Sequence, residues 1–355
     1  LTEVDGMLQR MRELSVQASN DTLTATDRRY LNDEVTALQA ELTRMSSAAR
    51  FNGERILDGN FAKTFQVGTE AGETVALTQG SVAASSLGAF QINGDGPEVH
   101  DPTTAGTAAP NLFDGTSNTV VANNLSTTVT TVAGSSAKTV AAAYNAVTAT
   151  TGVEATADTR INLVTTASGS IQIDTNDVVV AAAAVTTTSY GAIVNAINAV
   201  SGSTGVTAEL AADGSSFFLV DVDGDDIKLE RQDAVSGADI TMKSVHHDDS
   251  LGSAVTLQHA GQVGDLANAA GRISFSSSNA FSIDTGATAG DYTGSTSSLA
   301  ATQTALTSVD LTTRAKAGTS LSLIDGAIEK IGSMRASLGS LTNRLDHTVS
   351  FLDET

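Results

Sequence analysis

The feature that most constrains the fold of this sequence is an apolar repeat near its C-terminal end. The positions that recur every seven residues are Ile324, Ile331, Leu338, Leu345 and Leu352, and Leu321, Ile328 and Val349 hold the complementary heptad position. A period of about 3.5 residues over several heptads is typical of a long helix packed along partner helices, as in a coiled coil. An ordinary helical bundle, which needs no outside partner, fits the same pattern, so both arrangements stay open.

Two amphipathic helices are predicted at the N-terminal end, and they are the obvious partners. Residues 1–20 carry apolar side chains in steps of three and four, at Val4, Met7, Met11, Leu14 and Ala18. The second helix is expected to have Thr26 as its N-cap and to end near Arg50, before turn signals at 51–53 and 58–59. Its heptad stripe is Leu31, Val35, Leu38, Leu42, Met45 and Ala49. We therefore expect the chain ends to form a rod of long antiparallel helices, joined by a β-hairpin over residues 64–77.

Charge separates the middle of the chain from its ends. The 355 residues include 19 Lys and Arg against 40 Asp and Glu, a formal net charge of −21. Residues 64–309 hold 6 of the basic and 24 of the acidic side chains, so the two ends are nearly neutral. This excess of acid argues against binding to nucleic acid and against docking on an anionic membrane. The longest apolar run, 178–185, is too short for membrane insertion, and without cysteine there is no disulfide or thiol site.

The middle of the chain predicts strands and turns, and it contains an internal repeat. Residues 141–173 resemble residues 191–229, with matching Asn-Ala-Val and Thr-Gly-Val triplets 53 positions apart. We expect each copy to form a short helix, a strand after Gly-Val, a tight turn and two further strands. The predicted class is α+β, with a discontinuous helical rod domain of residues 1–88 and 300–355 and a variable β-rich insert of residues 89–299, which contains small α/β modules at about 138–173 and 190–240.

No arrangement of residues points to an enzyme. The five histidines form no HExxH motif, and no nucleophile elbow, P-loop or dinucleotide fingerprint occurs in a credible context. A metal candidate is the series Asp221, Asp223 and Asp225, which alternates like the first half of a calcium loop. Gln232 stands where an EF-hand has its bidentate Glu, so an exposed acidic turn is the competing interpretation. We expect no cofactor apart from this calcium candidate.

Several short motifs near both ends together resemble those of bacterial flagellins. Residues 8–17, LQRMRELSVQ, are similar to the family's LQRxRELxVQ signature, and residues 51–59 resemble the turn that closes its second helix. Residues 65–74 resemble its LQVGxxxGQT hairpin, and residues 324–345 match the pattern iDxAl…RaxLGAxqNRL at several positions. The motifs occur in the family's order over about residues 1–88 and 305–355. The repeated module also resembles the small insert module of many flagellins.

The resemblance implies a structural role. Flagellin is the building block of the bacterial flagellar filament, in which the terminal helices form the inner shells and the variable middle projects outward. The resemblance therefore predicts an extracellular protein that polymerises with other flagellin subunits for swimming motility. It also implies export through the flagellum's own type III apparatus, with an export chaperone and the filament cap as partners. Family members carry further helical segments on both sides of this part, so we expect the chain to fold but to polymerise poorly.

The resemblance also carries over one binding site, for an innate immune receptor. In flagellins of enteric bacteria a vertebrate Toll-like receptor reads the LQRxREL helix, and the matching positions are Gln9, Arg10, Leu14 and Glu34. Ordinary helix-surface charge also explains Arg10 and Glu34, and Leu14 also fits a core position. The alternative function is a cell-surface adhesin or polysaccharide-binding protein built on a flagellin scaffold, with Tyr190, Phe217, Phe218 and Tyr292 as aromatic candidates. A hook–filament junction protein shares the same terminal helices.

Overall fold

The computed structural model divides the chain into two compact units. It describes residues 1–20, 23–66, 74–94, 99, 117–211, 213–231, 239–257, 266–284 and 298–354. The helical unit consists of Leu1–Gln91, Ser276–Ala280 and Thr302–Thr355, and the β-rich unit consists of Ile92–Phe275 and Phe281–Ala301. The predicted α+β mixture, with long helices from both chain ends and a strand-rich middle, is confirmed.

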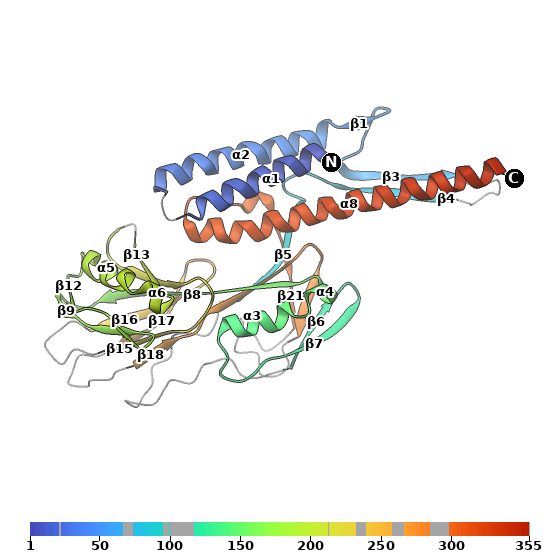
Figure 1. Ribbon diagram of the computed structural model, residues 1–355. Helices are drawn as coiled ribbons and strands as arrows, with labels where there is room; N and C mark the ends of the chain where they lie inside the picture. The colour runs from blue at the N-terminus through green and yellow to red at the C-terminus, as the bar shows by residue number, and fades with distance from the viewer. Residues whose placement is uncertain are drawn as a thin grey trace. The chain divides into compact units, whose positions relative to one another are not determined.

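Long helices form the frame of the helical unit (Figure 1). They are α1 (Thr2–Ala18), α2 (Ala25–Ala48) and α8 (Arg314–Glu354). α1 runs antiparallel to α8, and two ion pairs join them. Arg12 Nε lies 2.7 Å from Asp325 Oδ1, and Arg335 Nη1 lies 3.4 Å from Asp5 Oδ2. The chain reverses again between α1 and α2, so the helices from the two chain ends lie side by side.

The N-cap of α2 lies two residues earlier than the sequence predicts. The N-cap is Thr24 rather than Thr26, because the Thr24 hydroxyl accepts the amide of Asp27 (3.2 Å) and the Asp27 carboxylate accepts the amide of Thr24 (3.0 Å). This reciprocal arrangement is a capping box, which satisfies helix-end amides that have no partner within the helix. The hydrogen bonds from Thr24 lower the pKa of Asp27. Arg28 stabilises the segment between α1 and α2, because its guanidinium donates to the carbonyl oxygens of Ala18, Asn20 and Leu23.

The core of the helical unit is formed by one face of each long helix. The fully buried side chains of these helices include Val4, Leu8, Met11, Leu14, Ala18, Val35, Leu42, Ile324, Ala327 and Ile331. Leu31 and Leu38 pack against this cluster and are partly buried. On α1 the buried stripe uses Leu8 where the sequence predicts Met7, which packs at the margin. Transfer of these aliphatic groups out of water is the main stabilising contribution to such a unit.

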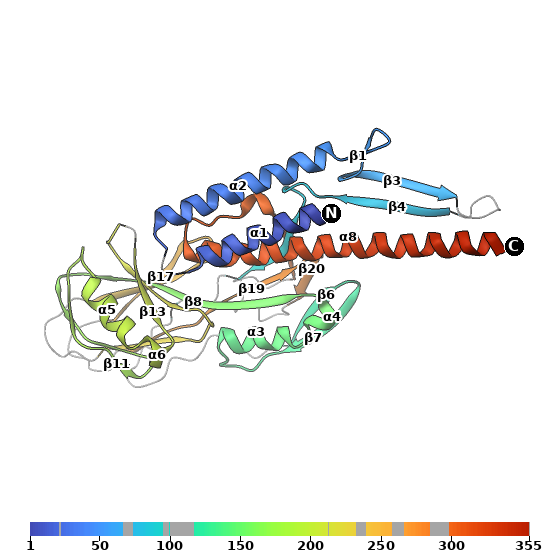
Figure 2. The ribbon, with the colours of Figure 1, turned by 45° about the horizontal axis from the view of Figure 1, so that its top comes forward.

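A long β-hairpin lies beside α8 (Figure 2). It consists of β3 (Asp58–Gln66) and β4 (Thr74–Ser81), and the short strands β1 (Arg50–Phe51) and β2 (Glu54–Arg55) connect it to α2. The hairpin begins at Asp58, earlier than the predicted range of 64–77. β4 comes so close to α8 that a Cβ on Gly80 would lie 2.5 Å from Met334 Cε. Gly80 of β4 therefore lies against the flexible end of the Met334 side chain on α8.

A pair of short strands precedes the segment that leads into α8. β22 (Thr302–Ala305) pairs antiparallel with β5 (Gly88–Asn93). α2 holds the segment that follows: Gln39 donates to the carbonyl oxygen of Leu306 (2.7 Å), and Asn32 accepts the amide of Leu311 (2.9 Å). Polar side chains on α2 thus fix the path by which the chain enters α8.

The β-rich unit is built from small antiparallel sheets and short helices. Its strands are β6 (Ser117–Ala122), β7 (Leu125–Thr130), β8 (Glu154–Thr165), β9 (Gly169–Ile171), β10 (Ile173–Thr175), β11 (Val178–Val179), β12 (Ala183–Val185), β13 (Thr207–Leu210), β14 (Phe217–Asp221), β15 (Ile227–Arg231), β16 (Ile240–Val245), β17 (Leu251–Leu257), β18 (Leu266–Ala269), β19 (Arg272–Ser277), β20 (Phe281–Asp284) and β21 (Leu299–Ala300). Its helices are α3 (Ala137–Asn145), α4 (Thr148–Thr151), α5 (Gly191–Ala199) and α6 (Ser201–Thr204). β14 pairs with one edge of β8 and β16 with the other, while β15 lies between β10 and β18, and β6 lies between β20 and β7.

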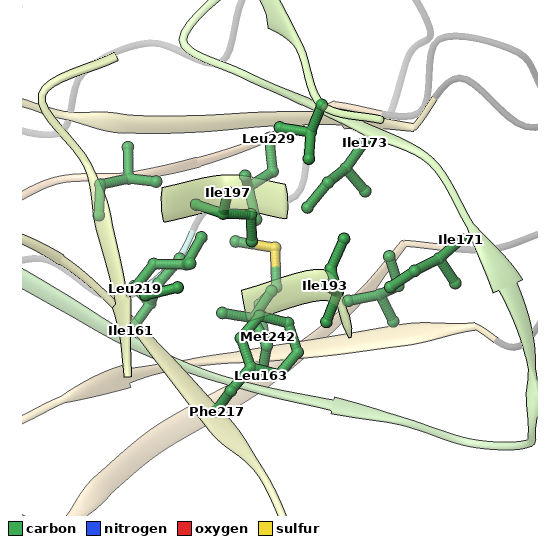
Figure 3. Close-up of a cluster of buried hydrophobic side chains, with 14 of the residues drawn as sticks. Ile161, Leu163, Ile171, Ile173, Ile193, Ile197, Phe217, Leu219, Leu229 and Met242 are labelled. Carbon is green, nitrogen blue, oxygen red and sulfur yellow. The ribbon is translucent and has the colours of Figure 1, made fainter. Parts of the chain in front are cut away.

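The core of the β-rich unit gathers around α5 (Figure 3). Ile193 and Ile197 of this helix lie among side chains from the surrounding strands, and Met242 fills the space between them. The strand side chains labelled there are Ile161, Leu163, Ile171, Ile173, Phe217, Leu219 and Leu229, each at most 1% exposed. Burial on this scale explains why a segment with few aromatic residues still forms a compact unit.

The two repeat segments make the same hydrogen bonds 53 residues apart. In the first, the Asn145 side chain accepts the amide of Ala155 and donates to its carbonyl oxygen, both at 2.8 Å. In the second, Asn198 makes the same pair of bonds with Ala208, at 2.7 and 2.9 Å. A glycine ends the helical turn that follows in each segment: Gly152 with a φ of 67° in the first and Gly205 with a φ of 77° in the second. The same side-chain clamp therefore ties helix to strand in both segments.

The two segments differ where the sequence predicts the same tight turn. In the second, β13 and β14 form a hairpin whose turn contains Gly214 at a φ of 69°. In the first, β8 is one continuous strand of 12 residues, so the prediction of a turn there is wrong. The reason is local, because the corresponding stretch 157–160, Ala-Asp-Thr-Arg, has no glycine to take up the left-handed conformation that reverses the chain.

Candidate functional site

The candidate receptor patch lies where α1 and α2 run side by side. Arg10 of α1 donates through Nε to Glu34 of α2 (2.8 Å) and through a terminal nitrogen to Glu13 (3.1 Å). These bonds, first of all that to Glu34, raise the pKa of Arg10. The side chains of Arg10 and Glu34 are 49% and 43% exposed, and Gln9 beside them is exposed. Exposed ion pairs of this kind contribute little to stability, so a binding partner can replace them at small cost.

Leu14 does not belong to this exposed surface. Its side chain is fully buried in the core of the helical unit, together with Met11 and Ala18 of the same helix face. The prediction that Leu14 forms part of a receptor surface is therefore corrected, and its core interpretation holds. The buried stripe of α1 recurs every three or four residues and includes position 14, whereas positions 9, 10 and 13 face the solvent.

Sequence reasoning missed an exposed aromatic residue on the same surface. Tyr30 of α2 is 68% exposed and lies one helical turn before Glu34, so the two side chains share a face of the helix. Exposed Tyr and Arg side chains are the types that most often dominate protein–protein contacts. The signal available in the sequence was the place of Tyr30 immediately beside, rather than within, the apolar stripe that begins at Leu31.

The predicted helix-packing residues divide into two groups. Val35, Leu42, Ile324 and Ile331 are fully buried within the chain itself. Leu31, Leu38, Leu338 and Leu345 are only partly buried, and the side chain of Leu352 lies outside the described part of the structure. The first group belongs to the chain's own core, and the second contains apolar positions that stay partly exposed. Whether α8 takes part in a true coiled coil stays a prediction.

The acidic series Asp221, Asp223 and Asp225 forms a turn that Lys138 neutralises in part. Lys138 Nζ lies 2.8 Å from Asp225 Oδ2 and 3.3 Å from Asp223 Oδ2, while Asp221 is buried and accepts the amides of both other residues. Burial raises the pKa of Asp221. Within the described residues, no three His, Cys, Asp or Glu side chains come together in a way that could hold a metal ion. Calcium binding at these residues stays a prediction.

Among the described residues, the aromatic candidates for sugar stacking are buried or have a cation over the ring. Tyr190 and Phe217 are at most 1% exposed and contact each other in the core, with ring centroids 5.2 Å apart. Phe218 carries the guanidinium of Arg160 over its ring at 4.3 Å, and Tyr292 lies outside the described residues. Sugar binding by aromatic platforms therefore finds no support in these residues.

Comparisons with known proteins identify the family. Residues 1–62 match the model of the bacterial flagellin N-terminal helical region. The B-type flagellin of Pseudomonas aeruginosa is 30% identical over 360 residues, an alignment that covers 99% of this chain and 72% of that protein. The chain belongs to the bacterial flagellin family. Flagellin B of Vibrio cholerae is 39% identical over 87 residues, which are 24% of this flagellin and 23% of the relative.

Solved structures of flagellar proteins are more distant. FliC from Burkholderia pseudomallei is 18% identical with a TM-score of 0.37, and the match covers 97% of this flagellin and 95% of that chain. FlgL from Xanthomonas campestris is 12% identical with a TM-score of 0.33, over 99% and 87% of the two chains. Flagellins are structural proteins of the flagellar filament, an extracellular assembly. In the described part of this flagellin, no helix is long and apolar enough to cross a membrane.

Proposed function

We propose that this flagellin is a structural subunit of the flagellar filament, that it polymerises for swimming motility, and that its β-rich unit is exposed on the filament surface. The observation that carries the proposal is the alignment with a B-type flagellin over 99% of the chain. The family is structural, and we propose no catalytic activity.

The distribution of charge supports the proposed orientation. Surfaces that pack against identical copies must avoid net charge, because like charges repel across a shared interface. The segments that supply the long helices are nearly neutral, whereas residues 64–309 hold 24 acidic against 6 basic side chains. An acidic unit that faces solvent keeps filaments apart, and the neutral helices are suited to contacts between subunits.

Cysteine labelling on intact filaments tests this proposal, because these 355 residues contain no cysteine. The experiment places Thr128→Cys, at an exposed position of β7, in the flagellin gene of the producing bacterium. A fluorescent maleimide should then mark the whole length of the filament. The control is Ser15→Cys, at a fully buried position of α1, which should stay unlabelled. Label confined to the cell body would contradict a filament subunit, and label only at the filament base would indicate a junction protein.

We propose further that the export chaperone, the filament cap and an innate immune receptor are partners of this flagellin. The receptor proposal rests on the exposed group of Gln9, Arg10 and Glu34, to which the structure adds Tyr30. In a receptor-reporter cell assay, Arg10→Ala should reduce the signal. Arg44→Ala is the matched control, since Arg44 is an exposed α2 arginine that is likewise paired with a glutamate, Glu41. An unchanged signal with Arg10→Ala rejects the patch.

We propose that the β-rich unit contains two copies of one small α/β module, at about residues 138–173 and 190–240. The clamps of Asn145 and Asn198, at the same spacing of 53 residues as the repeated triplets, support this. We refer to the segments that contain α3 and α5 as the first and second copy.

A further inference from the structure

The hairpin of β6 and β7 lies at the end of one sheet of the β-rich unit. The strand order of that sheet is β21, β20, β6 and β7, so within the described residues β7 pairs on one side only. The hairpin lies beside α3 of the first copy, and Val120 and Val129 are buried on its inner face (Figure 1). The side of β7 that faces away from β6 is therefore a sheet edge.

The loop of the hairpin determines which main-chain groups this edge presents. Its two residues, 123–124, both have positive φ values of 53° and 62°, and the residues on either side of them pair with each other. In such a hairpin the pair next to the loop exchanges hydrogen bonds, and bonded and non-bonded pairs then alternate along the strands. The amides and carbonyls of Ser126, Thr128 and Thr130 therefore point away from β6, and all three residues are exposed.

β7 lacks the features that usually prevent an edge strand from pairing with another chain. These features are a charged residue, a proline, a bulge or a very short strand. Other outer strands of the unit have them: β13 carries Glu209, β17 has an irregular register with β16, and β11 and β21 contain two residues each. β7 has six residues in regular register with β6, and residues 117–137 include no charged residue and no proline. Its Thr-Thr-Val-Thr sequence is also typical of paired strands.

The absence of charge favours an identical chain as the partner. Residues 64–309 hold 24 acidic against 6 basic side chains, so most surfaces of this unit repel the same surface of another copy. The hairpin contributes none of these charges. Exposed apolar side chains lie on and just after it, because Val121 is 42%, Leu125 53% and Val132 72% exposed. A second copy of this chain offers the same uncharged edge with the same apolar side chains.

We propose that β7 pairs antiparallel with β7 of a second chain, across a two-fold axis at Thr128. In this register Thr128 faces its own equivalent and Ser126 faces Thr130, so every outward amide and carbonyl of these residues finds a partner. A register shifted by two residues leaves one of the three without a partner strand. Leu125 of one chain also comes close to Val132 of the other, which brings exposed apolar side chains together.

The pairing is weak between free chains and effective where chains are held close together. A strand of six residues buries less area than the roughly 1,200–2,000 Å² of a stable protein–protein interface. Neighbours fixed at short distance associate without needing such an area, because their effective concentration is high. In a filament, a point that rests on the proposed function, the β7 edges would therefore join the β-rich units of neighbouring subunits.

Disulfide trapping of the free 355-residue chain tests the pairing, because these residues contain no cysteine. In Thr128→Cys the two thiols meet at the axis, where paired Cα atoms are about 5.5 Å apart, a distance that a disulfide spans. Mild oxidation should link this variant about tenfold faster than Ala254→Cys, since pairing raises the local thiol concentration. Ala254 is the matched control, an exposed position on the outer strand β17. Both linked products are measured on a non-reducing gel.

Charge variants of the Thr128→Cys chain test the register. Ser126→Glu with Thr130→Glu places like charges opposite each other and should lower the rate of linking to that of the control. Mixing this chain with one that carries Ser126→Lys and Thr130→Lys should restore the rate and give mixed dimers. Circular dichroism checks that each variant is folded.

The proposal is overturned if Thr128→Cys links no faster than Ala254→Cys, if the doubly acidic variant links as fast as its parent, or if the mixture gives no more product than the acidic chain alone. The trap uses free chains, so its failure would leave the filament proposal standing, and the maleimide experiment tests that proposal separately. Reducing the filaments before they are labelled keeps Thr128→Cys accessible there even where the disulfide forms.

Discussion

The heptad positions of α8 should differ sharply in what they contribute to stability. Ile331 is fully buried in the core of the helical unit, whereas Leu338, seven residues further along the same helix, is only partly buried. Replacing either by alanine removes three carbon atoms from the same helical stripe. The pair therefore separates the effect of burial from the effect of sequence pattern.

The expected magnitudes follow from the burial. Loss of a fully enclosed Ile side chain removes its transfer free energy and leaves a cavity, so Ile331→Ala should lower the free energy of unfolding by about 3 kcal/mol. At Leu338 part of the side chain already contacts water and no closed cavity forms, so Leu338→Ala should cost about 1 kcal/mol. Helix propensity favours alanine slightly at both positions and does not change the order.

Urea unfolding followed by far-ultraviolet circular dichroism measures this difference. The helical signal reports mainly on the helical unit, because α1, α2 and α8 are by far the longest helices described. Exposed Ser337→Ala serves as the control for substitution on α8 and should leave the midpoint nearly unchanged. Equal losses at Ile331 and Leu338 would refute the reasoning, since the heptad pattern rather than burial in the core would then determine the contribution.

Other expected outcomes concern backbone, hydrogen bonding and pH. Gly88→Ala should lower the free energy of unfolding of the helical unit by more than about 2 kcal/mol, because a Cβ there would lie 2.0 Å from the carbonyl oxygen of Thr304; urea unfolding checks this. Asn145→Ala and Asn198→Ala should each cost about 1–2 kcal/mol for two lost hydrogen bonds, and clearly unequal losses by tyrosine fluorescence would contradict equivalent clamps. Burial of Asp310 favours a higher pKa, but hydrogen bonds from Thr312 and Lys316 outweigh it and lower the pKa. The stability from Asp310 is therefore present above its unfolded pKa of about 4 and is lost as the pH falls through its lower folded pKa. Asp310→Asn should make the helical unit's midpoint less sensitive to acid, and an unchanged sensitivity would exclude this contribution.

Local signals in the sequence predicted the elements of the helical unit well. The apolar spacing of α1, α2 and α8 and the turn residues around Gly53 follow from the 3.6-residue period and from the conformational freedom of glycine. The predicted N-cap of α2 was wrong because two nearby threonines can both cap the helix. Thr24 and Thr26 are both good N-caps, and only the reciprocal bond with Asp27 selects Thr24.

The candidate sites were less predictable, because they depend on residues that are distant in the sequence. A motif match cannot tell that Leu14 is enclosed while Arg10, one helical turn earlier, is exposed and paired with Glu34. The sequence predicted a calcium site at the acidic turn because the turn shows only carboxylates nearby. The cation that pairs with them, Lys138, comes 85 residues before Asp223. Neither partner is visible in a local pattern.

The sequence by itself determined the class of the fold, the family resemblance and the separation of neutral ends from an acidic middle. These follow from periodicity, short motifs and charge, which are properties of neighbouring residues. The tertiary structure alone decided which heptad positions are enclosed and which charged side chains are paired. Burial and electrostatic environment arise only when distant segments exclude water together, and no local pattern encodes which segments those are.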